Sequence, residues 1–500
     1  MQTASCCCCW FLSLYKARKT YPLSDRNPMI AEVKLSTNLM DLKTGWQSLP
    51  PNASEALVSD QFVRPFLNAI GYDNTEIYPQ FPVGKKAVDY AARKADGSDI
   101  FVHTKANPYL YIEVKSRTEN FCADNHPNYR KAAFQLRGYL AHADSASVKW
   151  GVITNANHIQ LFRKHGKIMH PVTPCIAIEE SNLQKIVQDF KKITENPRRS
   201  LVVAIYNNKG GVGKTTTSIN LAATLTALKK KVLLIDFDPN QSDLGDALNL
   251  APTKGELFEA LKGRSAKNAD IRSVITRYQF EHPKLKTPIG FDVLPADERL
   301  GSELDEIKLR QQIKLEALWR SLEKLQTDYD YILIDAPPNW RTFAQKALFA
   351  ADVVLIPARH DNLHSLQNAG TAIREFIPEI QAERRAYGDA GPIALPIFMN
   401  NAHKETGPQM QLMHDAIKQI IRENKKDAVK ASKEINGVDL TPYFYPRYRK
   451  GQNSLNARMI SIPRMAYIAR ADFMHVPAAF AFKTAREQYI NLIKEYFINE

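Results

Sequence analysis

Cysteine is scarce in this 500-residue sequence, and its placement excludes a fold held together by disulfides or by a structural zinc ion. Six cysteines are present, of which Cys6 to Cys9 are consecutive and Cys122 and Cys175 are isolated. No pair has the spacing of zinc ligands, and consecutive cysteines cannot close a disulfide framework. The sequence therefore predicts a reduced, cytoplasmic protein.

A membrane-crossing segment is also missing from the N-terminal stretch. Residues Cys6 to Tyr15 are too short to span a bilayer, follow no positive charge and lack a clear cleavage site. We expect residues 1–35 to be disordered or misassigned, with Met29 as an alternative start. The helix expected from Ala485 to Phe497 mixes glutamate with lysine, unlike a membrane-targeting tail, so no membrane partner is predicted.

The length and the charge of the chain suggest its organisation and its partners. A chain of 500 residues exceeds what one hydrophobic core usually organises, which favours two domains. Hydrophobic residues make up 44% and charged residues 24%, as in a soluble globular protein. The net charge of +14 indicates a polyanionic partner, but charge alone does not separate nucleic acid from an acidic membrane.

One glycine-rich loop organises the C-terminal part of the chain. Leu201 to Ile205 reads as a buried parallel strand, and Ser218 to Leu228 repeats apolar residues at helical spacing. A glycine loop between them lets backbone N–H groups converge on phosphate oxygens at a helix N-terminus. Lys214 would reach the β- and γ-phosphates of ATP, and the Thr215 hydroxyl would bind Mg²⁺. The residues predicted to bind the nucleotide here are Gly210, Gly211, Val212, Gly213, Lys214, Thr215 and Thr216.

The loop departs from the ordinary phosphate-binding pattern at its start. Asn208 stands where the first glycine is expected, and Lys209 follows it. This deviant Walker A form resembles the ParA/MinD family of partition and positioning ATPases, and the similarity to ParA covers about Ser200 to Glu500. The resemblance implies a homodimer in the ATP state, in which Lys209 crosses to the partner's nucleotide. It also implies non-specific DNA binding and a ParB-like partner that stimulates hydrolysis.

Acids end two further strands that we expect in the same sheet. Asp236 and Asp238 end the apolar run that starts at Lys231, and Asp335 ends the run that starts at Tyr329. Alternating buried strands and helices predict a doubly wound parallel sheet, whose ligands bind at the carboxyl ends of the strands. Asp335 would hold Mg²⁺ through water. The resemblance places Asp236 near Mg²⁺ and lets Asp238 position the attacking water, while structural capping is the alternative for both acids.

Two later segments receive weaker assignments. The resemblance places Asn400 or Asn401, and the segment around Ile462, near the adenine. The stretch from Tyr443 to Lys450 interleaves aromatic and cationic residues. It suits a phosphate-contacting surface and, equally, a solvated basic loop that covers packed aromatics. Between the strand that ends in Asp236 and Asp238 and the strand that ends in Asp335, Gly255 to Tyr278 is expected to be helical.

The N-terminal part places acids and a lysine on successive expected elements. A helix is expected from Ser54 to Leu67, and then a turn-rich stretch from Gly71 to Gly84. Asp89 lies in the short strand expected next, over residues 86–92. Glu113 and Lys115 are two residues apart in the strand expected over residues 109–115, so both side chains point to one face.

The helix expected over residues 129–142 carries Gln135 and Tyr139, four residues apart on one face. An acid, then Glu-x-Lys, then Gln-xxx-Tyr resembles the PD-(D/E)XK nuclease superfamily, and most closely the N-terminal nuclease domains of type I restriction motor subunits. The resemblance spans about Glu55 to Arg163. It implies that Mg²⁺ is bound by carboxylates, that a lysine is catalytic, and that the Gln-xxx-Tyr pair positions substrate or the metal-binding face. The residues given these roles are Glu55, Asp89 and Glu113 for the metal, Lys115 for catalysis, and Gln135 and Tyr139 for positioning.

The chemistry accounts for this spacing of residues. Two carboxylates can hold one or two Mg²⁺ ions, which activate water and offset charge at the scissile phosphate, while the lysine orients or deprotonates the water. The sequence departs from the family pattern at Val88, where proline usually precedes the acid. A solvated acid–lysine pair on an exposed strand is the alternative for Glu113 and Lys115.

The predicted fold class is therefore α/β, with a restriction-endonuclease-like domain followed by a doubly wound P-loop NTPase domain. The stretch from Glu195 to Ser200 contains proline and paired arginines ahead of a buried strand, which marks a boundary. We expect a disordered or misassigned terminus at 1–35, a nuclease-like domain at 36–195 and an ATPase domain at 196–500.

The leading functional hypothesis is an ATP-dependent DNA-processing protein in which a ParA-like dimerising ATPase is coupled to a Mg²⁺-dependent nuclease, with a role in defence against foreign DNA. The alternative is a chromosome or plasmid partition ATPase whose N-terminal domain binds DNA or a partner without cleaving. A metal-cluster carrier is disfavoured, because no Cys-x-x-Cys lies in the ATPase part.

Overall fold

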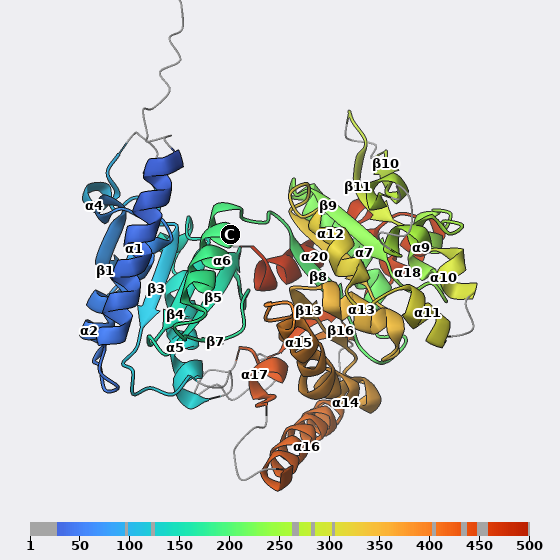
Figure 1. The fold of residues 1–500 in the computed structure, drawn as a ribbon. Helices are drawn as coiled ribbons and strands as arrows, with labels where there is room; N and C mark the ends of the chain where they lie inside the picture. The colour runs from blue at the N-terminus through green and yellow to red at the C-terminus, as the bar shows by residue number, and fades with distance from the viewer. Residues whose placement is uncertain are drawn as a thin grey trace, which may run out of the picture.

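The computed structural model describes residues 28–95, 99–121, 126–262, 270–281, 286–302, 306–402, 407–431, 438–447 and 459–498. Two seven-stranded sheets organise the chain, one in the N-terminal part and one in the C-terminal part, and a three-stranded sheet adjoins the second (Figure 1). The four consecutive cysteines lie outside the described residues. Helix α1 (Pro28–Ser48) begins within the stretch to which we assigned no structure.

The N-terminal sheet combines a meander with one parallel pair. Its strand order is β1-β2-β3-β4-β5-β6, and β7 also pairs with β5. Strands β3 and β4 are parallel, and the other neighbours are antiparallel. A helix connects the parallel pair, as such a crossover requires. The strands are β1 (Ile77–Val83), β2 (Lys86–Ala92), β3 (Leu110–Val114), β4 (Trp150–Thr154), β5 (His158–His165), β6 (Ile168–Pro171) and β7 (Ile176–Ala177).

Helices cover both faces of this sheet. Leu110, Ile112 and Val114 of β3 share one hydrophobic cluster with α1, α3 and α6, whereas Tyr111 belongs to a second cluster with α5. The period of two in β3 therefore sends Glu113 to the α5 face. The helices are α2 (Glu55–Val58), a π-helical turn (Ser59–Val63), α3 (Arg64–Ala69), α4 (Phe101–Thr104), α5 (Pro127–Leu140) and α6 (Leu183–Glu195), with short 3₁₀ turns at Asn74–Glu76 and Ala143–Ser145.

The C-terminal sheet is parallel except at one edge. Its order is β10-β11-β9-β12-β8-β13-β15, and only β10 runs antiparallel to its neighbour. A smaller parallel sheet of β14, β16 and β17 follows. The strands are β8 (Leu201–Ile205), β9 (Val232–Asp236), β10 (Thr276–Phe280), β11 (Ile289–Leu294), β12 (Tyr331–Asp335), β13 (Val353–Leu355), β14 (Pro357–Ala358), β15 (Ile393–Ala394), β16 (Phe398–Ala402) and β17 (Ile460–Pro463).

Alternate residues of the central strand β8 face opposite helical layers. Val202 and Ala204 belong to the cluster with α13, whereas Leu201, Val203 and Ile205 belong to the cluster with α7 and α20. This is the doubly wound architecture that the alternation of strands and helices predicted. The helices are α7 (Lys214–Ala227), α8 (Asp243–Leu248), α9 (Glu256–Leu261), α10 (Glu298–Ser302), α11 (Glu306–Gln312), α12 (Ala317–Glu323), α13 (Thr342–Ala350), α14 (Leu363–Thr371), α15 (Ile377–Arg385), α16 (Gly407–Ala431), α17 (Thr441–Phe444), α18 (Tyr467–Phe473), α19 (Ala478–Ala481) and α20 (Lys483–Tyr496), with a 3₁₀ turn at Ile271–Val274 and a π-helical turn at Ala372–Phe376.

Two local predictions were wrong. The stretch from Gly71 to Gly84, expected to be turn-rich, contains strand β1. Pro79 and Pro82 obscured it, since proline is tolerated only on an edge strand, and β1 is the edge of its sheet. The stretch from Gly255 to Tyr278, expected to be helical, ends in strand β10, whose hairpin partner β11 supplies hydrogen bonds that the local pattern does not reveal.

The two sheets are joined by a buried arginine of β5. Arg163 donates hydrogen bonds to three successive carbonyls of the connecting segment, at 2.6 Å to Arg198, 3.0 Å to Arg199 and 2.8 Å to Ser200. Arg199 in turn forms an ion pair with Asp330, at 2.8 Å, just before β12. The segment that leads into β8 is therefore fixed from both sides.

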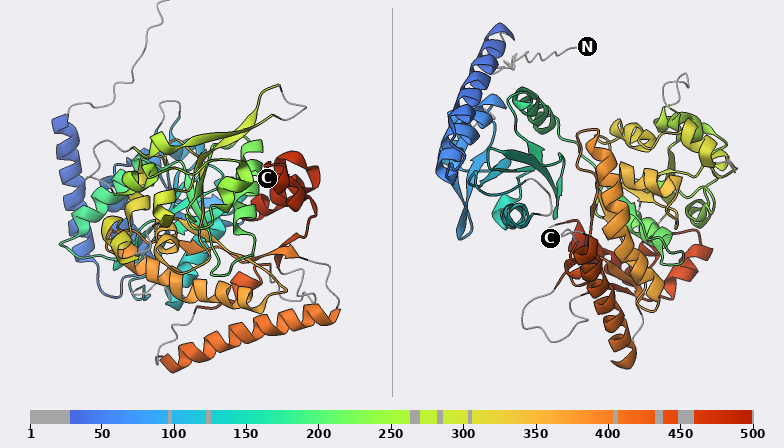
Figure 2. Two further views of the ribbon diagram at one scale, coloured as in Figure 1. Left: turned by 90° about the vertical axis from the view of Figure 1, so that its right-hand side faces the viewer. Right: turned by 60° about the horizontal axis from the view of Figure 1, so that its bottom comes forward.

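The β5–β6 turn reinforces this junction by contacting the C-terminal helix. The ring of His165 packs edge-on against Tyr331 at the start of β12, with centroids 4.9 Å apart. The Lys167 backbone N–H donates to the Phe497 carbonyl at 3.1 Å. Figure 1 shows α20 lying at the junction between the two halves of the molecule, and Figure 2 shows the molecule from two further sides.

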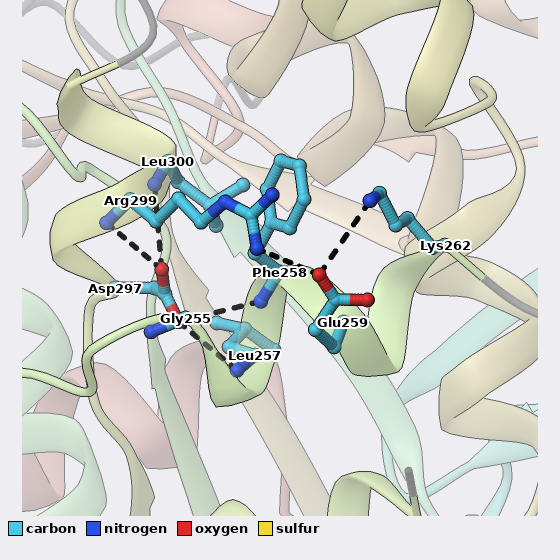
Figure 3. Close-up of polar contacts among 8 residues, drawn as sticks. All are labelled: Gly255, Leu257, Phe258, Glu259, Lys262, Asp297, Arg299 and Leu300. Carbon is cyan, nitrogen blue, oxygen red and sulfur yellow. Dashed lines mark hydrogen bonds and ion pairs between the residues drawn. The ribbon is translucent and has the colours of Figure 1, made fainter. Parts of the chain in front are cut away.

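A buried carboxylate fixes the short helices α9 and α10 (Figure 3). Oδ2 of Asp297 accepts hydrogen bonds from the backbone N–H groups of Gly255, Leu257 and Phe258, at 3.1, 3.0 and 3.3 Å. Oδ1 accepts from the N–H of Arg299 at 3.0 Å. These are N–H groups that a helix N-terminus leaves without intrahelical partners, so Asp297 caps both helices.

Candidate functional site

The glycine-rich loop after β8 is shaped as an open cradle. Gly211 and Gly213 have φ angles of +72° and +83°, in the left-handed region that favours glycine. A Cβ atom at Gly210 or Gly211 would meet no atom within 4 Å, so space lies beside the backbone there. Helix α7 starts at Lys214, which directs its first N–H groups toward the loop. The strand–loop–helix prediction is confirmed.

Lys214 is buried at the base of this cradle. Its Nζ donates a hydrogen bond to the Lys209 carbonyl at 3.3 Å. Burial lowers the pKa of Lys214, and the charges of Asp335, Asp238 and Asp243 oppose that shift. A buried cation with one hydrogen-bond acceptor among the described residues suits a phosphate group, which supplies several oxygen acceptors.

Asp335 at the end of β12 is held by two hydroxyl groups of α7. Its Oδ2 accepts from Thr215 Oγ1 at 2.7 Å and its Oδ1 from Ser218 Oγ at 2.9 Å. Burial raises the pKa of Asp335 to about 6. The sequence reasoning missed Ser218, although its position three residues after Thr215 puts both hydroxyls on one helical face.

Asp236 lies directly beside Asp335, because β9 and β12 pair in register at these two residues. Burial and the charge of Asp335 raise the pKa of Asp236 to about 8. Asp236 also accepts hydrogen bonds from the backbone N–H groups of Asp238 at 3.3 Å and Gly245 at 3.2 Å. It therefore also caps the end of its strand, as the structural alternative proposed. Two adjacent buried carboxylates and a hydroxyl are oxygen donors of the kind that Mg²⁺ prefers.

Asp238 occupies the turn after β9, close to Lys214. It is 8% exposed, and its Oδ1 accepts from the Asn240 N–H at 3.3 Å. Burial raises its pKa, and the positive charge of Lys214 opposes the shift. The loop behind it is fixed by Gly301 of α10, where a Cβ would overlap the Pro239 carbonyl oxygen. Because Asp297 caps α10, which contains Gly301, Asp297 also supports the turn that holds Asp238.

The remaining predicted residues surround the loop. Asn400 Nδ2 donates to the Val212 carbonyl at 2.9 Å, which ties the end of β16 to the cradle. Asn401 adopts a left-handed backbone with φ of +57°, and its side chain is half-buried. Lys209 and Thr216 are half-buried on the loop and the first turn of α7. An adenine-binding role for the two asparagines stays a prediction.

The second predicted cluster gathers on the α5 face of the N-terminal sheet. Lys115 Nζ contacts Glu113 Oε1 and donates to the Val114 carbonyl at 2.9 Å, while Glu55 Oε1 lies 3.7 Å away. Asp89 Oδ2 accepts from the Val114 N–H at 2.7 Å. Helix α2, strand β2 and the end of β3 thus bring together Glu55, which the resemblance added, and the three residues that the motif order predicted, Asp89, Glu113 and Lys115.

Glu113 is the fully buried carboxylate of this cluster. Burial raises its pKa to about 7, the charges of Asp89 and Glu55 act in the same direction, and Lys115 opposes them. Its Oε2 is buried and has no hydrogen-bond partner among the described residues. An orphaned carboxylate oxygen beside a lysine suits a divalent cation.

Helix α5 lies over this cluster. Gln135 Nε2 donates to the Tyr139 hydroxyl at 3.2 Å. Burial raises the pKa of Tyr139, with further contributions from Glu113 and Asp89, so the hydroxyl lies within the field of the acids. Across the part of the chain that the structure describes, no three His, Cys, Asp or Glu side chains already stand close enough together to hold a metal ion.

Comparison with known proteins gives matches to part of the chain. Residues 200–386 match the family model described as AAA domain. The Bacillus subtilis sporulation initiation inhibitor protein Soj is 37% identical over 161 residues, which cover 32% of this chain and 58% of Soj. The Caulobacter vibrioides chromosome partitioning protein ParA is 38% identical over 170 residues, which cover 33% of this chain and 57% of ParA. The chain thus spans little more than half the length of these curated relatives.

Solved structures were also matched, at low sequence identity and low TM-score. A complex of Cyanothece McdA with ATP covers 61% of this chain and 98% of McdA, at 20% identity and a TM-score of 0.42. MinD with Mg-ADP from Pyrococcus horikoshii covers 59% of this chain and 95% of MinD, at 19% identity and a TM-score of 0.38.

The C-terminal part of the chain is therefore similar to P-loop ATPases of the ParA type, by the family model over residues 200–386 and by the partition relatives. The range matched by the family model, residues 200–386, does not include the N-terminal sheet, and a nuclease identity for that sheet stays a prediction. Of the helices that the structure describes, none is both long and apolar enough to cross a membrane.

Proposed function

We propose that the chain is an ATP-dependent DNA-processing protein, in which a ParA-type ATPase couples to a Mg²⁺-dependent nuclease domain. The observation that carries the proposal is the convergence of two motif sets in one chain. Thr215, Asp236 and Asp335 meet at one end of the C-terminal sheet, and Asp89, Glu113 and Lys115 meet on one face of the N-terminal sheet.

ATP and Mg²⁺ fit the C-terminal site by the chemistry of its donors. The glycine cradle offers backbone N–H groups to phosphates, and Lys214 offers a buried positive charge. Burial raises the pKa of both Asp236 and Asp335, and the charge of Asp335 adds to the shift at Asp236, so a bound cation would stabilise their charged forms. Asp238 would orient a water near the nucleotide, and Lys209 would reach the nucleotide of a partner subunit in a dimer.

Both the strand order of the N-terminal sheet and the positions of its acidic residues favour a nuclease function. Three antiparallel strands, a crossover helix and a fourth strand parallel to the third place Asp89 and Glu113 on adjacent strands. When bound, Mg²⁺ would activate water and offset charge at a phosphodiester. The chain's own contribution would be to hold the ion with Asp89 and Glu113, and to orient the water with Lys115.

The junction suggests how the two halves are coupled. Arg163, the connecting segment and Tyr331 meet at the amino ends of β8 and β12, whereas the nucleotide residues lie at the carboxyl ends of these strands. A five-residue strand spans about 16 Å, so the N-terminal sheet contacts the edge opposite the nucleotide. Nucleotide-driven dimerisation would therefore act on the nuclease by bringing two of these fixed units together.

Plasmid cleavage tests the proposal. Purified full-length protein is incubated with supercoiled plasmid and Mg²⁺ or Mn²⁺, with and without ATP, beside the Lys115→Ala and Lys214→Ala variants. We expect cleavage by the wild type, loss of cleavage with Lys115→Ala, and loss of only the ATP dependence with Lys214→Ala. Absence of cleavage under all these conditions would overturn the nuclease part.

A second candidate function is favoured by a specific observation. Glu113 is already paired with Lys115, and no three-residue metal group stands formed among the described residues. This arrangement also suits a partition-type ATPase whose N-terminal domain binds DNA or a partner protein without cleaving. In that case DNA would stimulate ATP hydrolysis equally in the wild type and in Lys115→Ala, and neither would cut plasmid.

A further inference from the structure

Helix α5 presents a cationic face that the predicted motifs do not account for. Arg130, Lys131 and Arg137 are exposed on it, and none of them forms an ion pair with a described residue. Phe134 lies among them and is 77% exposed, although it is a large apolar side chain. The 14-residue helix contains no aspartate or glutamate. An unpaired cation cluster around an exposed aromatic ring is the composition of nucleic-acid-binding surfaces.

The opposite side of α5 explains why this face is so well defined. Tyr129, Ala132, Leu136 and Tyr139 pack into the hydrophobic cluster against the sheet. Burial of this side fixes the rotation of the helix, and the residues at positions 130, 134 and 137 then share the outward side at helical spacing. The face is a consequence of the buried pattern, because its orientation cannot change without exposing the cluster.

The face borders both the acid cluster and the C-terminal part. Gln135 and Tyr139 of the same helix lie over Glu113 and Asp89. On the other flank, Arg130 and Arg137 are near enough to Tyr443 of α17 for their charges to act on its pKa, which burial raises. Figure 1 shows α17 reaching toward the N-terminal part. The segment that begins at Tyr443 is the aromatic and cationic stretch predicted to contact phosphates; its residues 448–450 lie outside the described part.

We propose that the α5 face, defined as Arg130, Lys131, Phe134 and Arg137, binds the backbone of duplex DNA and presents it to the acid cluster. This inference rests on the proposed function and deepens it by naming the substrate-binding surface. Charge complementarity argues for DNA, since each cation can neutralise a phosphate. Arg130 and Arg137 are seven residues apart, about 10 Å along the helix, which is comparable with the major-groove width of about 12 Å.

The test is equilibrium binding of a fluorescein-labelled 20-base-pair duplex to full-length protein, followed by anisotropy at several salt concentrations without ATP. One variant combines Arg130→Ala, Lys131→Ala and Arg137→Ala. Its matched control combines Lys185→Ala, Arg320→Ala and Lys483→Ala, which removes the same charge from exposed cations of α6, α12 and α20. A third variant, Phe134→Ala, removes the ring without changing charge.

We expect the α5 variant to bind at least about 10-fold more weakly than the control at 0.1 M salt, and its log–log salt slope to be smaller by about 2 to 3. Phe134→Ala should weaken binding several-fold and leave the slope unchanged. A variant that combines Arg130→Lys and Arg137→Lys keeps the charge and should keep the salt slope of the wild type, which separates loss of phosphate contacts from misfolding. Thermal melting followed by circular dichroism checks that each variant is folded.

Three outcomes would overturn this inference, and they bear differently on the proposed function. If the α5 variant and its control bind alike while the wild type still cuts plasmid, the DNA-binding face lies elsewhere and the proposed function stands. If the wild type neither binds the duplex nor cuts plasmid, both proposals fail. A change of self-association, rather than of DNA binding, in Phe134→Ala would assign the face to protein contact and would equally overturn it.

Discussion

The Thr215 hydroxyl donates a hydrogen bond of 2.7 Å to Asp335 Oδ2, which joins the first turn of α7 to the end of β12. The two groups are 120 residues apart in the sequence. Parallel pairing of β12 with β8 brings them together, because both strands end at the same edge. A hydroxyl and a carboxylate in this relation can share one magnesium ion directly or through water.

Asp335→Asn should uncouple nucleotide binding from Mg²⁺. The amide keeps the size of the carboxylate and can still accept from one of the two hydroxyls, but it lacks the charge that holds the ion. We expect Mg²⁺ affinity in the presence of a non-hydrolysable ATP analogue to fall about 10- to 100-fold. Isothermal titration with and without Mg²⁺ measures this, and Ser218→Ala, which removes only a hydrogen bond, is the milder comparison. Equal Mg²⁺ dependence in the wild type and Asp335→Asn would rule out this role.

Asp236→Asn should change how stability depends on pH. The folded-state pKa of about 8 lies above the ordinary value of 3.8, so the folded state holds an extra proton between those values. Stability from this group therefore falls as pH rises through that window. The variant lacks this ionisation, so its melting temperature minus that of the wild type should rise by a few degrees from pH 5 to pH 8.5 in the absence of Mg²⁺. A difference that is constant with pH would contradict the burial of a titrating carboxylate here.

Glu113 should control a pH-dependent metal affinity in the N-terminal cluster. Its pKa of about 7 means that the carboxylate is largely protonated below that pH and cannot then bind a cation. We expect Mn²⁺ affinity, measured by titration calorimetry, to rise about 10-fold between pH 6 and pH 8 and to be lost in Glu113→Gln.

Lys115→Ala provides the matched comparison for this prediction. Lys115 lowers the pKa of Glu113, so its removal should shift the pH midpoint of Mn²⁺ binding upward. A midpoint that does not move would show that the Glu113–Lys115 contact has no influence on the metal. Because the readout is binding, this result does not depend on whether the domain cleaves DNA.

Gly166→Ala should loosen the junction between the two sheets. The residue has φ of +58°, and a Cβ there would overlap the Phe497 carbonyl oxygen. Gly388 has φ of +72° but nothing within 4 Å of a Cβ position, so Gly388→Ala reports the backbone strain alone. We expect a loss of about 1 kcal/mol of unfolding free energy from strain in each variant, and at least about 2 kcal/mol more for Gly166→Ala.

Hydrogen exchange distinguishes a loosened junction from general destabilisation in the glycine pair. Faster exchange confined to the β5–β6 turn and the end of α20 in Gly166→Ala, absent from Gly388→Ala, is the expected pattern. Equal effects of the two substitutions would mean that the β5–β6 turn does not stabilise the end of α20.

Local patterns in the sequence determined most of the elements and the identity of the P-loop site. The apolar run of β8, the glycines after it and the acids ending β9 and β12 are each readable within a few residues, because strand burial and phosphate binding impose local composition. The same holds for Asp89, Glu113 and Lys115, whose order along the chain predicted that they would meet. The local signal was misleading at β1, which two prolines obscured, and at β10, where pairing with a neighbouring strand outweighed it.

Only the tertiary structure decided which distant groups share an environment. Nothing near Arg163 in the sequence indicates that its guanidinium holds the segment leading into β8, and nothing near Asp297 indicates that it caps two helices. Neither the raised pKa of Asp236 nor the outward face of α5 could be read from composition, because each depends on what packs around it. A short motif carries its chemistry in its own residues, whereas burial, desolvation and the meeting of surfaces are properties of the packed chain.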